Sequence, residues 1–388
     1  MRVLFMCHRF SDLKVGGMAE FLHYLPAALQ KIGVDSIIYA QSENEKSNAI
    51  SSVKLDNGIM CYQGPFIKPG WFVSNKKLDP FLALCKEQRI DLIHSQGIYR
   101  CGIMAMKATK RLKIPFIVTS HSDILGASSS RLNRRNVRVR CAKVLKRANG
   151  VTHLTPAMAD AVYTIYNARD KSVIIGNGID LPAWEKFANS AEKNYLLAIG
   201  RLAPEKGFDV LINAYAELVK HGQTLSLVIA GAGAEEKNLQ SQAKNTGLNV
   251  VTHFSVGSDI PANSILFTGY VNGETKLRLF SECKIVLFSP QSLIWEEPFG
   301  IVQIEAMAAG KALIASETEA TRFLEQQGLQ AETVTAHDVT EWVYAITDLL
   351  KRDEERKRMG EVNRENSKQF DWPLIAKQYA EFYKKIIK

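Results

Sequence analysis

Short apolar runs alternate with longer amphipathic stretches along most of the chain, and this alternation predicts its secondary structure. The runs resemble buried strands in length and composition, whereas the stretches between them place apolar residues three or four apart, as helices do. In the first half the predicted strands are Val3–Met6, Ser36–Tyr39, Leu92–His94, Phe116–Thr119 and Val151–Leu154. Gly17–Lys31 is predicted to be a helix that Pro26 bends. Such alternation is typical of α/β proteins with parallel sheets.

The pattern is interrupted once and then resumes, which divides the chain into two α/β domains. It stops near Val173–Gly178, and the polar segment Leu181–Asn194 is predicted to be a linker. A second series follows, with strands predicted at Tyr195–Ile199, Leu225–Ala230, Ile265–Thr268, Ile285–Ser289 and Ala312–Ala315, and helices at Asp209–His221, Glu235–Thr246 and Glu274–Ser281. We therefore predict domains at residues 1–180 and 181–370, then a C-terminal segment, 371–388, whose helix Leu374–Ile387 follows a break at Trp372-Pro373.

Composition narrows the class of protein. The 388 residues are 46% hydrophobic and 23% charged, which is typical of globular proteins. No apolar run approaches the roughly 20 residues that a membrane-spanning helix needs, and the run after Met1 is too short for the core of a signal peptide. The six cysteines lack the spacing of metal ligands or redox pairs, so we expect reduced thiols in a cytoplasmic protein.

Charge is divided unevenly between the two halves. Residues 1–180 contain 26 basic and 13 acidic side chains, although the net charge of the whole chain is only +9. The densest basic run, Arg131–Arg147, is predicted to form a helix with cations on one face and Val137, Cys141 and Val144 packed inward. That face is either simply solvated or attracted to an anionic lipid surface or to phosphates of a substrate. Nucleic acid is disfavoured, because no aromatic side chains alternate with the charges to stack on bases.

The most informative motif is a pair of glutamates eight positions apart, Glu297 and Glu305. Between them, Phe299-Gly300 is predicted to turn the chain into a helix, Val302–Ala309, that ends at Gly310. Glu297 would then lie in the loop before the helix and Glu305 on about its first turn. Amides at a helix N-terminus attract phosphate, and carboxylates bind hydroxyl groups. The arrangement therefore favours a ligand in which hydroxyl-bearing groups flank a diphosphate, as in a nucleotide sugar.

The residues around the two glutamates resemble retaining glycosyltransferases of the GT-B architecture, most closely glycosyltransferase family 4. Trp295-Glu296-Glu297-Pro298-Phe299-Gly300 and Glu305-Ala306-Met307-Ala308-Ala309-Gly310 match the family's Glu-x7-Glu motif, and Gly200-Arg201-Leu-Ala-Pro-Glu-Lys206-Gly207 matches its Arg-x4-Lys-Gly pattern. The resemblance implies two Rossmann-like domains that face a central cleft, and a C-terminal helix that crosses back to the first domain. It also implies that the C-terminal domain binds the nucleotide sugar and the N-terminal domain the acceptor.

The resemblance assigns donor-binding roles to particular residues. Arg201 and Lys206 would bind the diphosphate and stabilise its charge as the sugar leaves. Glu297 would bind hydroxyls of the donor sugar, and Glu305 those of the ribose. Further donor contacts, mostly through the backbone, are expected at Gly16, Gly17, Gly269, Tyr270, Val271, Phe299, Gly300, Ile301 and Val302. By contrast, Gly231-Ala232-Gly233 is interpreted as a tight turn, because the third glycine of a dinucleotide site is missing.

A histidine completes the predicted catalytic set of His121, Arg201, Lys206 and Glu297. His121 follows a predicted strand and matches the family's strand-end histidine beside the donor sugar, where it would bind the 6-hydroxyl. Asp123 would orient the ring. His94 and Gln96 end another strand and are candidates for the acceptor site. The chain has no Asp-x-Asp motif, so we expect neither a metal ion nor another cofactor.

The resemblance, together with these patterns, implies a retaining, metal-independent hexosyltransferase. It would move a sugar from a nucleotide diphosphate sugar, with UDP favoured by the resemblance, to a glycan or lipid-linked acceptor of cell-surface polysaccharide or lipopolysaccharide. It would act in the cytoplasm or on the inner face of the membrane. Two alternatives stay open: a nucleotide-sugar 2-epimerase of the same fold, and a non-catalytic protein that binds sugar nucleotides.

Overall fold

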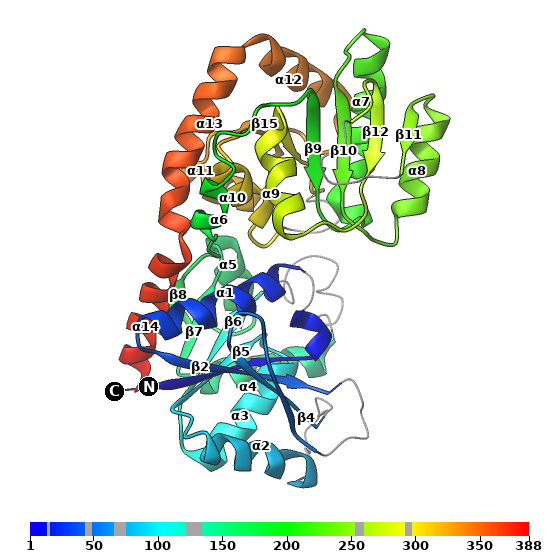
Figure 1. The fold of residues 1–388 in the computed structure, drawn as a ribbon. Coiled ribbons are helices and arrows are strands. Elements are labelled where there is room, and N and C mark those ends of the chain that lie inside the picture. The colour runs from blue at the N-terminus through cyan, green and yellow to red at the C-terminus, as the bar shows by residue number, and fades with distance from the viewer. Residues whose placement is uncertain are drawn as a thin grey trace. The chain divides into compact units, whose positions relative to one another are not determined.

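The protein folds into two compact α/β units. The computed structural model describes residues 1–13, 16–42, 49–65, 75–121, 134–252, 260–291 and 297–387. Unit 1 consists of Met1–Gly178 and Phe370–Lys388, and unit 2 consists of Ile179–Gln369 (Figure 1). The chain thus leaves unit 1 once and returns to it at its C-terminal end.

The described residues of the two units form fifteen strands. They are β1 (Arg2–Cys7), β2 (Asp35–Gln41), β3 (Ser51–Lys54), β4 (Met60–Gly64), β5 (Leu92–Gln96), β6 (Phe116–Ser120), β7 (Gly150–His153) and β8 (Ser172–Ile174) in unit 1, and β9 (Tyr195–Ile199), β10 (Ser226–Ala230), β11 (Asn249–Val251), β12 (Ser264–Phe267), β13 (Ile285–Phe288), β14 (Ala312–Ser316) and β15 (Glu332–Val334) in unit 2.

Helices connect most of these strands. They are α1 (Gly17–Lys31), α2 (Asn75–Glu87), α3 (Arg100–Leu112), α4 (Arg135–Arg147), α5 (Pro156–Tyr163), α6 (Leu181–Glu185), α7 (Phe208–Lys220), α8 (Glu236–Asn245), α9 (Gly273–Glu282), α10 (Ile301–Ala308), α11 (Glu319–Gln326), α12 (Val339–Lys351), α13 (Asp353–Ser367) and α14 (Trp372–Ile387), with 3₁₀ turns η1 (Phe10–Leu13), η3 (Arg169–Lys171), η4 (Pro204–Lys206) and η5 (Lys368–Phe370). No helix within the described residues is both long and apolar enough to span a membrane.

Unit 1 is built on an eight-stranded sheet in the order β3-β4-β2-β1-β5-β6-β7-β8. All neighbours are parallel except β3, which runs antiparallel to β4 at one edge. The winding reverses direction between β1 and β5, where Val3 lies opposite Ser36 on one side and Leu92 on the other. In open α/β sheets, ligands bind at the carboxyl ends of strands beside such a reversal.

Alternate residues of each central strand in unit 1 pack against helices on opposite faces. On β1, Val3 and Phe5 face a cluster with α1 and α14, whereas Leu4 and Met6 face a cluster with α2, α3 and α4. All four side chains are fully buried. A strand covered on both faces must be apolar throughout, which is why these strands appear in the sequence as continuous apolar runs.

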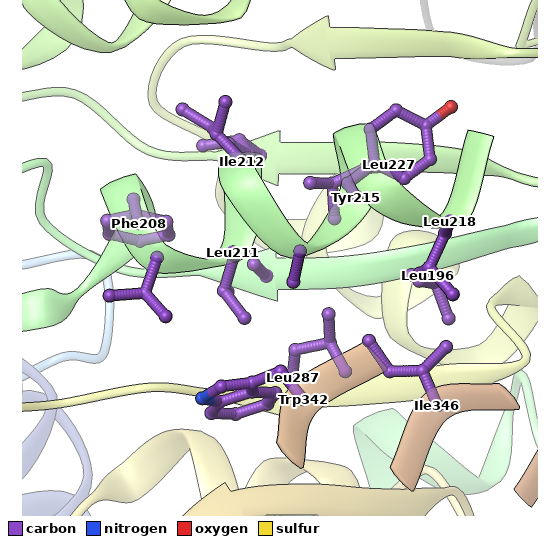
Figure 2. Close-up of a cluster of buried hydrophobic side chains, with 14 of the residues drawn as sticks. Leu196, Phe208, Leu211, Ile212, Tyr215, Leu218, Leu227, Leu287, Trp342 and Ile346 are labelled. Carbon is purple, nitrogen blue, oxygen red and sulfur yellow. The ribbon is translucent and has the colours of Figure 1, made fainter. Parts of the chain in front are cut away.

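Unit 2 repeats this design with a wholly parallel seven-stranded sheet, ordered β11-β12-β10-β9-β13-β14-β15. Figure 2 shows its core, where Phe208 and Leu211 of α7 lie over the sheet beside Trp342 and Ile346 of α12. Trp342 is fully buried and donates its indole N–H to the carbonyl oxygen of Ala336, 3.2 Å away. Each such buried side chain stabilises the fold by roughly 1.5–3 kcal/mol.

The C-terminal helix α14 packs in unit 1, as predicted. It contacts α1, and the Trp372 ring stacks on Tyr24 with ring centroids 5.9 Å apart. A Cβ at Gly178 would lie 2.5 Å from the Trp372 ring, so only glycine allows the ring to sit this close to the chain. The two parallel-sheet α/β units and the returning helix confirm the predicted fold class.

The ten predicted strands are all present, with bounds within two residues of those expected. Five strands were not predicted, namely β3, β4, β8, β11 and β15; most of them are short strands at the edges of the sheets. The prediction of a linker at Leu181–Asn194 is wrong. The segment opens with α6, and Glu192 forms hydrogen bonds with Arg356 and Lys311.

Candidate functional site

The Lys206 loop of unit 2 follows the central strand β9 and is held against the end of β13. The Oγ atom of Ser289 donates to the carbonyl oxygen of Lys206 at 2.8 Å, and the amide of Gln291 donates to the carbonyl oxygen of Glu205 at 2.9 Å. Gly207 follows with φ +65°, and a Cβ there would lie 2.1 Å from the Ser289 carbonyl oxygen. Glycine is therefore required for the loop to approach β13 this closely.

Lys206 and Glu297, which are 91 positions apart in the sequence, form an ion pair. The Lys206 side chain is 19% exposed and that of Glu297 only 9%. Since the two charges are largely shielded from water, their attraction is stronger than that of a surface pair. Arg201, in the same loop, instead pairs with Glu205 at 2.6 Å and leaves 65% of its side chain exposed.

The turn between the two glutamates leads into α10 as predicted. Gly300 adopts a left-handed conformation, with φ 71° and ψ 61°, at the N-cap of the helix. Phe299 beside it is buried. Gly300 has no side chain with which to cap the first amides of α10, and these amides carry the positive end of the helix dipole. Residues 292–296, which include Trp295 and Glu296, lie outside the described residues.

Glu305 is the fifth residue of α10, one position further into the helix than predicted, because the helix begins at Ile301. Its carboxylate pairs with Lys276 of α9, and the two side chains are 6% and 18% exposed. Sequence reasoning missed Lys276. It stands five positions after Val271, one of the expected donor contacts, but nothing in its local sequence indicates a partner on α10.

Three loops that follow β9, β10 and β12 pack against one another. The amide of Gly231 donates to the carbonyl oxygen of Gly269 at 2.8 Å. A Cβ at Gly231 would lie 1.8 Å from the Gly200 carbonyl oxygen, and one at Gly233 would lie 2.1 Å from that of Leu202. These glycines therefore serve close backbone packing, as predicted for a tight turn. Nearby, Tyr270 is 52% exposed and Val271 is half-buried.

In unit 1 the predicted glycine loop opens helix α1. Gly16 is the N-cap of α1, with φ 98°, and the amide of Glu20 donates to its carbonyl oxygen at 3.1 Å. Among the described residues beyond its chain neighbours, no atom lies within 4 Å of a Cβ built at Gly16, so glycine is favoured there by the backbone conformation. Gly16 and Gly17 are both exposed to solvent.

His121 directly follows β6 and is 7% exposed. Its Nε2 atom lies 2.8 Å from Oε1 of Gln96, which ends β5, and its ring meets Phe21 edge-on with centroids 5.2 Å apart. Burial lowers the pKa of His121 to about 4, so the ring is neutral at pH 7. Asp123, the predicted orienting residue, lies outside the described residues.

The prediction that His94 lines an acceptor site is corrected by its surroundings. His94 is fully buried, with Nδ1 2.8 Å from Oη of Tyr383 on α14 and Nε2 2.5 Å from Oγ1 of Thr119. Burial, and then the neighbouring His121, hold the pKa of His94 well below its usual value. Gln96 is also buried, with 2% exposed, and it contacts His121 instead of facing solvent.

Within the described part of the chain, no three His, Cys, Asp or Glu side chains gather as metal ligands do.

The basic helix is present as α4, although residues 131–133 of the predicted run lie outside the described residues. Val137, Cys141, Val144 and Leu145 are buried, and the cations Arg135, Arg138, Lys143, Lys146 and Arg147 are exposed.

The two parallel-sheet α/β units and the returning helix have the fold of GT-B glycosyltransferases. Two family models match the chain: "Glycosyltransferase Family 4" over residues 15–182 and "Glycosyl transferases group 1" over residues 183–366. Together the two models span nearly the whole chain, which therefore belongs to the glycosyltransferases that combine these two domains.

Known relatives and solved structures agree with this assignment. The chain is 22% identical to glycogen synthase of Mycobacterium tuberculosis, over 99% of this chain and 94% of the relative. It is 23% identical to the O-antigen chain mannosyltransferase C of Escherichia coli, over 94% and 92%. Sucrose-phosphate synthase from Thermosynechococcus elongatus has the same fold, with a TM-score of 0.74, 18% identity and coverage of 99% and 98%. Anabaena HepE in complex with UDP-glucose matches with the same TM-score and identity, over 99% of this chain and all of HepE.

Proposed function

We propose that the protein transfers a hexosyl group, with retention of configuration, from a nucleotide diphosphate sugar to a glycan or lipid-linked acceptor. The observation that carries the proposal is the pairing of Lys206 with Glu297. It places a cation suited to a diphosphate beside a carboxylate suited to sugar hydroxyls. A ligand that offers both groups can separate this pair and bind both partners.

The donor would extend from this pair along unit 2. Lys206 and Arg201 would bind the diphosphate, together with the N-terminal amides of α10. Glu297 would bind the sugar, and Glu305, held by Lys276, would bind the ribose hydroxyls. The backbone of Gly269–Val271 would contact the base. In unit 1, Gly16-Gly17 would contact the diphosphate and His121 the donor sugar.

The proposed chemistry needs few groups. The acceptor oxygen would attack the anomeric carbon from the face that the diphosphate leaves, and the leaving oxygen would take the acceptor's proton. Negative charge grows on the diphosphate in the transition state, where Lys206 and Arg201 would stabilise it. Because these cations supply the positive charge, we propose that transfer requires no metal ion and no other cofactor.

Relatives guide the choice of donor and acceptor. UDP-glucose binds to HepE, which shares the fold, so a UDP-sugar is favoured. The similarity to an O-antigen chain mannosyltransferase favours an acceptor in cell-surface polysaccharide or lipopolysaccharide synthesis.

A donor screen tests the proposal. The protein is incubated with a panel of nucleotide sugars, with and without a chelator, and the nucleoside diphosphate released by slow hydrolysis is measured. We expect release from one donor, unaffected by the chelator and abolished in Glu297→Ala. Release that requires a divalent cation would contradict metal independence.

The same screen separates the alternatives. Recovery of the 2-epimer of the donor sugar without any acceptor would identify an epimerase instead. Failure to bind any nucleotide would refute the proposal. Binding without release, even when candidate acceptors are added, would favour the non-catalytic alternative.

We propose further that α4 brings the enzyme to an anionic membrane surface that carries its acceptor. Five cations are exposed on this helix, its sequence contains no acidic residue, and Val139 is 41% exposed among them. Each cation near an anionic surface contributes about 1 kcal/mol of attraction.

Sedimentation with lipid vesicles tests this second proposal. Vesicles that contain phosphatidylglycerol should retain the protein at low salt, and the double variant Lys143→Glu, Lys146→Glu should lose most of this binding. Lys237→Glu, Lys244→Glu on α8, which also reverses two exposed charges, is the matched control. Equal binding to neutral phosphatidylcholine vesicles would contradict an electrostatic attachment.

A further inference from the structure

The Gln96 side chain lies between the two buried histidines of unit 1. Its Oε1 atom is 2.8 Å from Nε2 of His121, and its Nε2 atom donates to the backbone carbonyl oxygen of His94 at 3.3 Å. Gln96 is 2% exposed and His121 7% exposed. Both contacts are therefore shielded from competing water.

The partners of Gln96 determine which way its amide points. A backbone carbonyl can only accept a hydrogen bond, so the atom of Gln96 that faces His94 must be its NH₂ group. The atom that faces His121 is then the amide oxygen, which can also only accept. It follows that Nε2 of His121 carries a hydrogen and that, in the neutral ring, Nδ1 has the free lone pair.

We propose that Gln96 is a positioning residue, which holds His121 in its Nε2–H tautomer so that Nδ1 can accept a hydrogen bond from a hydroxyl of the donor sugar. This inference rests on the proposed function for the role of His121 in transfer. The tautomer itself does not depend on that role and can be measured without any substrate.

The surroundings of His121 support a ring that stays neutral and fixed. Phe21 of α1 packs against it edge-on, and the neighbouring His94 is itself buried, with a pKa well below its usual value, so it is neutral at pH 7. Burial keeps the pKa of His121 near 4. A neutral ring with one defined lone pair can bind a hydroxyl hydrogen without exchanging a proton with solvent.

Gln96 also connects His121 to the returning helix. His94, whose carbonyl oxygen holds the Gln96 amide, contacts Oη of Tyr383 on α14 through its ring. His94 thus contacts Gln96 through its backbone and Tyr383 of α14 through its ring. This arrangement keeps the ring in one orientation before the donor binds.

The first test is NMR of the full-length protein labelled with ¹⁵N-histidine at pH 7, with the His121 signals assigned by their loss in His121→Gln. We expect Nε2 to be the protonated nitrogen and Nδ1 the unprotonated one. The opposite tautomer, or an equal mixture of the two, would overturn the proposal. This measurement would stand even if no donor were ever found.

The second test compares two substitutions of Gln96. Gln96→Leu removes the acceptor oxygen, so the His121 signals should show a mixture of tautomers. Turnover should fall roughly ten- to hundredfold, the range seen when the partner that orients a metal-bound histidine is lost. Gln96→Glu keeps an oxygen opposite Nε2, so Nε2 should stay protonated. Its charge favours the protonated ring, however, and its second oxygen faces the His94 carbonyl oxygen, so turnover should stay below that of the wild type.

A matched control is Gln41→Leu, which removes another buried glutamine, at the end of β2. It should change neither the His121 signals nor turnover. If Gln96→Leu left the tautomer and turnover as in the wild type, Gln96 would have no positioning role. If the tautomer responded as expected but the wild type released no nucleotide from any donor, the proposed function would fail while the assignment of the ring stood.

Discussion

Replacing Lys206 by alanine is the substitution whose effect the site geometry defines best. It removes the cation that pairs with Glu297, in a place where the two side chains are 19% and 9% exposed. Loss of one preorganised group that stabilises transition-state charge costs about 3 kcal/mol, or a factor of 10²–10³ in kcat. Because Lys206 is partly solvated, we expect the lower end of this range, about a hundredfold. The Glu297 carboxylate, left without this partner, should also destabilise unit 2 by about 1–3 kcal/mol.

The assay is steady-state release of nucleoside diphosphate from the donor that the screen identifies, with thermal unfolding measured in parallel. Lys220→Ala is the control, because Lys220 pairs with Glu217 on the surface, where their side chains are 63% and 41% exposed. Its effect should stay within about 0.5 kcal/mol. The double variant Lys206→Ala, Glu297→Gln should recover stability but not turnover. Wild-type kcat in a folded Lys206→Ala protein would refute the reasoning.

Three further results are expected from other parts of the structure. Glu305→Ala should weaken binding of the nucleoside diphosphate by roughly tenfold, which is the usual contribution of a hydrogen bond to a charged group. Wild-type affinity in calorimetric titration would argue against a contact between Glu305 and the ribose. Gly231→Ala should lower the free energy of unfolding by at least about 2 kcal/mol, because its Cβ would lie 1.8 Å from a backbone oxygen. Gly222, with φ 83° and open space around it, is the control, and Gly222→Ala should lower that free energy by only about 1 kcal/mol. Equal losses in urea denaturation would contradict the predicted clash at Gly231. Burial lowers the pKa of His153 to about 4 from an unfolded value near 6.5. The unfolded chain therefore binds more protons between these limits, and His153 should lower the free energy of unfolding by up to roughly 3 kcal/mol as pH falls from 6.5 to 4. The buried His94 and His121 add to the same dependence, so His153→Gln should reduce the slope without abolishing it, and an unchanged slope would show that His153 does not contribute.

The alternation of apolar runs predicted the fold well, because strands covered on both faces must be apolar throughout. The alternation did not predict strands whose side chains are exposed to solvent. All four residues of β3 are exposed, so this strand carries no apolar signal and is defined by its hydrogen bonds to β4. Glu192, in the segment predicted to be a linker, is likewise held by Arg356, which is 164 positions away.

The sequence predicted those residues of the candidate site that belong to family motifs, but not their partners from other helices. The family pattern indicates Lys206, Glu297 and Glu305, but not that Lys276 of a neighbouring helix pairs with Glu305. Two histidines that each follow or end a strand, His94 and His121, look alike in the sequence. They differ because α14, nearly 300 positions further along the chain, brings Tyr383 onto His94. Such contacts depend on tertiary packing, which no local pattern encodes.

The most direct test of the central claim, that these paired charges of unit 2 form a nucleotide-sugar site, is calorimetric titration of the protein with UDP. The account predicts saturable binding in the wild type and its loss in the double variant Lys206→Ala, Glu305→Ala, provided that variant remains folded. If neither UDP nor any other nucleoside diphosphate bound, or if the double variant bound as tightly as the wild type, the claim would be contradicted.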